Sequence, residues 1–254
     1  MLKLTKYEFR KNLPSIIIIF LILAVAQGYF TISFLVHSIA HSAIASMILM
    51  IVGSISFIVV IVFGINAYDK ELKSKSSYLI FMTPNSSLKI IFSKIFYTFI
   101  FGVILFTILI SFSYIDVKML ASFADTSIDY TQIIKAVLAS LGLDYMSIFY
   151  GIITGIVTMI ISILFIITLS YFSITLASTW LQNKKVKGFI SVVIFFIIMI
   201  ATEWISHQIP TIYANPSTTF QAIISVLPSV IFELVISLGC IFGSAVLLDK
   251  KVSL

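Results

Sequence analysis

Six apolar stretches, each about as long as a bilayer is thick, dominate this chain of 254 residues. A helix needs about 20 apolar residues to cross about 30 Å of hydrocarbon. Such stretches lie at about 15–36, 43–68, 90–114, within 146–180, at 189–205 and at 222–248. Within hydrocarbon the backbone must satisfy its own hydrogen bonds, so these runs form helices despite their β-branched residues. The sequence predicts an all-α integral membrane protein with about six transmembrane helices.

Composition excludes a soluble domain. Hydrophobic residues make up 60% of the chain and charged residues 10%, whereas soluble domains carry about 25% charged residues. The net charge of +6 would suggest nucleic acid in a soluble protein. Here the basic residues cluster between apolar runs, so membrane topology explains them and no nucleic-acid partner is expected. The one cysteine, Cys240, forms no intrachain disulfide.

The basic residues orient the chain. They gather before the first stretch, after the second, after the fourth and after the sixth, at residues 3–11, 70–94, 184–187 and 250–251. These places alternate correctly for one side of a membrane, and the other side receives only Lys118 and Lys135. The positive-inside rule then predicts that both termini are cytoplasmic.

The first stretch has an alternative interpretation. Its basic start and Ala24-Val25-Ala26 before Gln27 resemble a secretory signal peptide with its cleavage site. The apolar run continues to Val36, which favours a membrane anchor. Cleavage would leave the orientation of the other stretches unchanged.

We expect a single transmembrane domain over residues 1–254, with three segments outside the spans. Residues 1–14 predict an interfacial helix with a basic stripe, and Pro14 breaks the direction just before the first span, although a plain basic flank would also set the topology. Residues 116–145 form an extracellular segment, in which Asp129 begins a helix. Residues 69–94 are cytoplasmic.

The cytoplasmic segment 69–94 is the most informative part of the sequence. It is basic at both ends and contains an apolar patch at residues 78–82. Thr83 and Pro84 are typical of a helix start, with Thr83 as the cap. An exposed apolar patch in a short loop is unfavourable unless something covers it. The segment therefore either sets topology alone or docks on the membrane, on this chain or on a partner.

Two segments resemble the permease subunits of ABC transporters of the type 2 exporter class. In that family a loop after the second span runs from acidic residues through a basic stretch and an apolar run to Thr-Pro and a Ser/Lys-rich turn. This chain matches it at Asp69, Glu71, Lys73, Lys75, Tyr78, Leu79, Thr83, Pro84, Ser86 and Lys94. The opening Leu4-Thr5-Lys6-Tyr7-Glu8-Phe9 also matches. The resemblance covers the whole chain in topology and these two segments in residues.

The resemblance implies a coupling helix that sits in a groove on an ATPase. Its contact residues here would be Met82, Thr83, Pro84, Asn85, Ser86, Ser87 and Lys89. It implies ABC ATPase subunits and a second permease copy or homologue as partners, in a bacterial cytoplasmic membrane. The cargo would be a hydrophobic or amphipathic peptide, drug or lipid, including antimicrobial peptides as a form of resistance.

The sequence lacks a nucleotide-binding motif and a catalytic constellation. No glycine is followed by lysine, so the phosphate-binding loop GxxxxGK[ST] is absent. ATP and Mg²⁺ would therefore bind to the partner ATPase, and we expect no cofactor and no enzymatic activity in this chain. His37 and His41 share a helical spacing but have no third ligand, so no metal site is expected.

Glu203 and Glu233 are acidic residues within the apolar stretches. Carboxylates inside a membrane are candidates for function. Both could line an exit path for cargo, or both could simply reach the outer interface or a neighbouring polar group. Two GxxxG patterns, at residues 151–155 and 239–243, permit close helix approach.

Two other functions compete with the exporter permease. One is a secondary transporter or channel, which usually holds ionisable residues near the bilayer midplane. The middle of these stretches is almost bare of charge, which favours the permease. The other is a membrane scaffold or sensor subunit that transports nothing.

Overall fold

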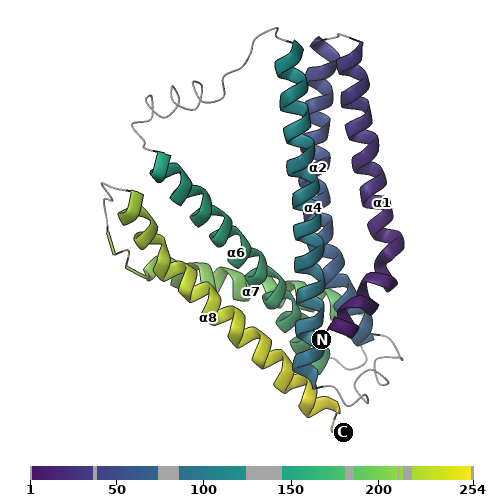
Figure 1. Cartoon of the computed structure of the whole chain (residues 1–254). Coiled ribbons are helices and arrows are strands. Elements are labelled where there is room, and N and C mark those ends of the chain that lie inside the picture. Colours follow the sequence, from purple (N-terminus) through teal and green to yellow (C-terminus); the bar gives the residue numbers. More distant parts are fainter. Residues whose placement is uncertain are drawn as a thin grey trace. The chain divides into compact units, whose positions relative to one another are not determined.

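The computed structural model describes residues 2–36, 39–73, 86–123, 145–180, 186–210, 212–213 and 219–252. These residues form six helices (Figure 1): α1 (Leu2–Leu35), α2 (Ile39–Lys73), α4 (Ser87–Phe123), α6 (Tyr145–Trp180), α7 (Lys187–Gln208) and α8 (Thr219–Val252). Each helix is long and apolar enough to cross a membrane. Within these ranges there is no strand. Over these residues the structure confirms the prediction of an all-helical chain with six helices able to span a membrane.

The helices extend beyond the apolar stretches that predicted them. α4 continues past Tyr114 through Asp116 and Lys118 to Phe123, because helical hydrogen bonding does not stop where the hydrocarbon ends. α1 begins at Leu2 and contains Pro14 within it. Proline removes one backbone hydrogen bond and crowds the preceding turn. Figure 1 accordingly shows the first turns of α1 bent away from the rest of that helix.

Interfacial placement of residues 1–14 and the cytoplasmic position of both termini stay predictions. The helix predicted from Asp129 lies outside the described residues.

The chain divides into two compact units. The first unit comprises Met1–Asn66 and Phe92–Asp129, and the second comprises Ala67–Ile91 and Tyr130–Leu254. α2 and α4 each belong to both units, because the chain passes from one unit to the other within these helices. The prediction of a single domain over residues 1–254 remains untested by this division.

The first unit is held together by a stripe of large apolar side chains from three helices. α1, α2 and α4 run side by side in this unit (Figure 1). Its buried cluster takes two residues from α1, one from α2 and two from α4: Ile19, Leu23, Val60, Phe101 and Leu105. The two residues from α1 are four apart, as are the two from α4, so each pair lies on one helix face. Burial of each such side chain contributes about 1.5–3 kcal/mol.

α2 and α4 approach each other closely at Gly64. A β-carbon placed on Gly64 would overlap the side chain of Thr98 on α4. A β-carbon on Gly102, also on α4, would meet nothing within 4 Å. Glycine at position 64 is therefore required by packing, whereas glycine at position 102 is not.

We expect Gly64→Leu to lower the stability of the first unit by about 1–3 kcal/mol, because the added side chain overpacks the α2–α4 contact. Gly102→Leu is the matched control and should leave stability within about 0.5 kcal/mol of the parent. SDS titration of the detergent-solubilised variants measures both. Equal unfolding midpoints for the two variants would show that α2 and α4 do not approach at Gly64.

In the second unit α6 packs against both α7 and α8. Its buried cluster contains Phe165, Leu169 and Cys240. A β-carbon on Gly243 would lie 2.9 Å from the Phe172 ring, whereas β-carbons on Gly151, Gly155 and Gly239 would meet nothing within 4 Å. The GxxxG pattern of α8 therefore serves α6–α8 packing through one glycine, and the pattern of α6 lies open.

Candidate functional site

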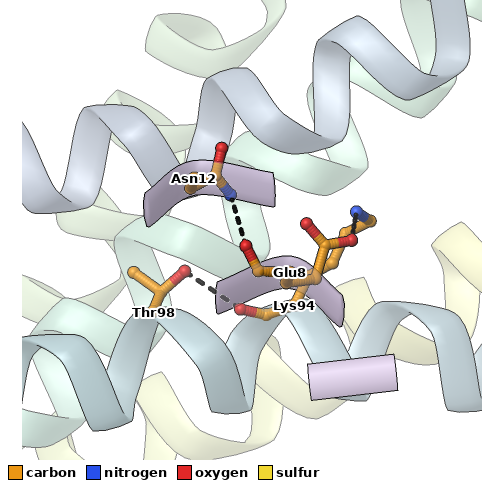
Figure 2. Close-up of polar contacts among 4 residues, drawn as sticks. All are labelled: Glu8, Asn12, Lys94 and Thr98. Carbon is orange, nitrogen blue, oxygen red and sulfur yellow. Dashed lines mark hydrogen bonds and ion pairs between the residues drawn. The ribbon is translucent and has the colours of Figure 1, made fainter. Parts of the chain in front are cut away.

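A buried ion pair joins α1 to α4. Lys94 Nζ lies 2.6 Å from Glu8 Oε1, and the two side chains are 2% and 7% exposed. Figure 2 shows the pair with Asn12 and Thr98, which lie one turn further along their helices. Hydrogen bonds between ionised groups at this distance are about twice as strong as those between neutral groups.

The local sequence explains why this pair is buried. Thr5, Glu8 and Asn12 are spaced three and four residues apart, so they form one polar stripe on α1. Thr5 and Glu8 are both buried. Beside this stripe the Phe9 ring meets the Tyr97 ring of α4 edge to face, with centroids 4.8 Å apart and planes at 76°. Aromatic packing thus excludes water from the ion pair.

A side chain one turn further along each helix hydrogen-bonds to the backbone of each partner (Figure 2). The Asn12 side-chain amide donates to the Glu8 carbonyl oxygen at 3.1 Å. The Thr98 hydroxyl donates to the Lys94 carbonyl oxygen at 2.9 Å. A buried ion pair adds little net stability because both charges lose water, but removing one partner leaves a costly buried charge. The pair therefore fixes how α1 and α4 align.

The ion pair connects the two segments on which the family resemblance rests. Glu8 belongs to the opening residues 4–9, and Lys94 ends the segment 69–94. The sequence predicted that Lys94 lies in a loop that sets topology, and it predicted no separate role for Glu8. The polar stripe at residues 5, 8 and 12 is a signal that could have indicated burial of Glu8. Nothing in the sequence pairs Glu8 with a residue 86 positions away.

The residues at the two ends of the segment 69–94 make contacts within the second unit. The Tyr68 hydroxyl, near the end of α2, lies 2.7 Å from Thr175 Oγ1 of α6. The Tyr68 ring stacks on Tyr171 with centroids 4.2 Å apart. At the start of α4, the Ser87 hydroxyl donates to the Asp249 carboxylate of α8. The end of α2 and the start of α4 are thus tied to α6 and α8.

The predicted coupling residues fall partly within the described structure. Met82, Thr83, Pro84 and Asn85 lie outside the described residues. Ser86 precedes α4 and is exposed, and Lys89 is exposed on the first turn of α4. Ser87 is buried by its contact with α8. Lys89 and Ser86 are therefore accessible to a partner, and Ser87 has a structural role.

The two carboxylates predicted for a translocation path have different surroundings. Glu233 on α8 is half-buried, and the Ser162 hydroxyl of α6 donates to its Oε2 at 3.0 Å. Glu203 on α7 is exposed, as is His207 one turn later. The structure thus places Glu233 against a neighbouring helix and Glu203 on the surface of its own helix.

A third carboxylate, Asp116, contacts a neighbouring helix. It lies on α4 beyond the apolar stretch that predicted this helix, and it accepts a hydrogen bond from the Gln27 side chain of α1 at 2.5 Å. This contact joins the same two helices as the Glu8–Lys94 pair, nearer their other ends. The extracellular position of the segment 116–145 stays a prediction. The helix boundary at Phe123 could not be deduced from hydropathy alone.

Within the described ranges, no group of three His, Cys, Asp or Glu side chains could hold a metal ion. His41 is exposed on α2, and His37 lies outside the described residues. The chemistry available at the candidate site is therefore ion pairing and hydrogen bonding between helices.

Comparisons of the chain with protein-family models, with characterised proteins and with solved structures found no match.

Proposed function

We propose that this chain is the membrane-spanning permease subunit of an ATP-driven ABC exporter. A separate ATPase supplies the energy, and the chain works with a second copy of itself or with a homologous permease. It moves a hydrophobic or amphipathic substrate across a bacterial cytoplasmic membrane. The substrate class is a peptide, a drug or a lipid, and amphipathic antimicrobial peptides are included.

The Glu8–Lys94 ion pair is the observation that supports this proposal most. In the proposed mechanism the coupling contact at residues 82–89 receives movement from the ATPase. Lys94 lies five residues beyond that contact on the same helix, α4. In this mechanism α4 carries the movement to Lys94, and the buried 2.6 Å ion pair passes it to Glu8 of α1.

Contacts at the two ends of the segment give a second route for the same movement. Tyr68 contacts α6 through Thr175 and Tyr171, and Ser87 contacts α8 through Asp249. ATP binding would close the ATPases, displace the coupling contact and tilt α6 and α8 through these residues. The cargo path would lie at the interface between the two permeases.

Export by inverted membrane vesicles tests the proposal. Vesicles that contain the chain and its ATPase should accumulate a fluorescent amphipathic peptide when ATP is added, and vanadate should stop this uptake. Uptake that a proton gradient drives without ATP would instead establish a secondary transporter. Absence of uptake under both conditions, for peptides, dyes and lipids alike, would leave the scaffold function.

Glu233 gives a sharper prediction within the same assay. We expect Glu233→Gln to slow export of a cationic peptide about tenfold, equal to about 1.4 kcal/mol of barrier height, because glutamine keeps the Ser162 hydrogen bond but loses the charge. Glu203→Gln is the matched control for a change of charge at an exposed position and should export at the rate of the parent. Unchanged export by Glu233→Gln at equal expression would exclude a role for its charge.

A further inference from the structure

A groove runs along the first unit between α1 and α2. It is lined from Ser15 to Ile22 on α1 and from Val52 to Phe63 on α2, and its volume is about 390 Å³. Two lining residues are serines, and the Ser56 hydroxyl is bonded to its own helix at Val52 O. The groove is therefore apolar, and it lies within two helices that can cross a membrane.

Water does not fill such a groove inside hydrocarbon. The occupant must be an apolar chain from the bilayer or a helix from another protein. The groove follows α1 from Ser15 to Ile22, about 10 Å, and its volume of about 390 Å³ gives room for part of an acyl chain. A helix laid over the groove is the other occupant. The charge at one end of the groove favours the lipid, and the experiments below distinguish the two.

One end of the groove is basic. The groove ends at Ser15 on α1, and Lys11 lies four residues earlier, before Pro14. Lys11 is exposed, as are Lys6 and Arg10 on the preceding turns. A lysine at this depth can reach the headgroup of a lipid whose acyl chain enters at Ser15. Attraction to an anionic headgroup at a membrane surface contributes about 1 kcal/mol per basic residue.

We propose that the α1–α2 groove binds one acyl chain of an anionic phospholipid, whose phosphate pairs with Lys11. The lipid fills the space between α1 and α2 that their side chains leave open. This inference does not rest on the proposed function, because the groove would hold a lipid whether or not the chain couples to an ATPase.

Photolabelling in reconstituted vesicles tests this proposal. The full chain is placed in phosphatidylcholine vesicles with a small share of phosphatidylglycerol that carries a photoreactive acyl chain, or with the equivalent phosphatidylcholine probe. We expect the phosphatidylglycerol probe to label peptides from residues 15–22 and 52–63 about fivefold more than the phosphatidylcholine probe. Lys11→Gln should remove this preference, and Lys6→Gln, on another face of α1, should retain it.

A pair of tryptophan substitutions tests the groove itself. Ile55 lines the groove and is 53% exposed, whereas Ile58 on the same helix is 60% exposed and does not line it. Ile55→Trp should abolish labelling in the groove, and Ile58→Trp should not. Equal labelling of the two variants, or labelling spread evenly over all six helices, would overturn the proposal. Crosslinks between the α1–α2 peptides of two copies, in place of lipid label, would also overturn the proposal.

Discussion

Replacing Lys94 with methionine is expected to lower the free energy of unfolding by about 3–5 kcal/mol, because it leaves the Glu8 carboxylate buried without its counter-charge. Lys94 is 2% exposed and Glu8 is 7% exposed, so water cannot replace the lost partner. Lys89→Met removes a lysine of the same helix that is exposed, and it is the matched control. It should change stability by about 0.5 kcal/mol or less.

A double-mutant cycle separates the ion pair from general damage. Glu8→Gln alone should also destabilise the protein, because it leaves the Lys94 ammonium buried without its counter-charge. The double variant Glu8→Gln with Lys94→Met should recover most of the loss, since replacing both members of a buried pair is often nearly neutral. Unfolding by SDS titration gives the four free energies. Strictly additive losses would mean that Glu8 and Lys94 do not interact.

Replacing Thr83-Pro84 with Gly-Gly is expected to reduce the affinity for the proposed ATPase partner about thirtyfold, equal to about 2 kcal/mol, the size of a central interface contact. The substitution removes the predicted helix cap, Thr83, and the proline predicted at the first helical position. It leaves the buried anchors at Tyr68, Ser87 and Lys94 unchanged. The fold of the permease should therefore survive while the coupling contact is lost.

The matched control for that experiment replaces Pro210-Thr211 with Gly-Gly. It makes the same change of residue types in the connection between α7 and α8. Titration of the purified ATPase onto each permease variant, followed by fluorescence anisotropy, gives the affinities. Equal affinity of the two variants would show that residues 82–89 are not the coupling contact.

The spans could be predicted from the sequence because hydrophobic length alone decides whether a helix can cross a bilayer. The predicted stretch at 189–205 lies within α7, and that at 222–248 lies within α8. The ends of the helices could not be predicted, because helical hydrogen bonding continues through polar residues such as Asp116 and Lys118.

The contacts between helices were beyond sequence analysis. Burial of Glu8 and Lys94 depends on which faces of α1 and α4 meet, and either residue alone looks like an ordinary charged residue at the edge of a span. Tyr68 and Thr175 are 107 positions apart, and neither stands out in its own stretch. The residues that match the family pattern could be identified in the sequence. The contacts that hold Glu8 and Lys94 in place could be identified only in the structure.

Purification of the tagged chain from its native membranes in a mild detergent tests the central claim most directly. The expected result is an accompanying soluble chain that contains the phosphate-binding loop GxxxxGK[ST]. Its amount should fall in the Thr83-Pro84→Gly-Gly variant and stay constant in the Pro210-Thr211→Gly-Gly control. A folded, monodisperse permease that brings down no ATPase would contradict the assignment of this chain as an ABC exporter permease.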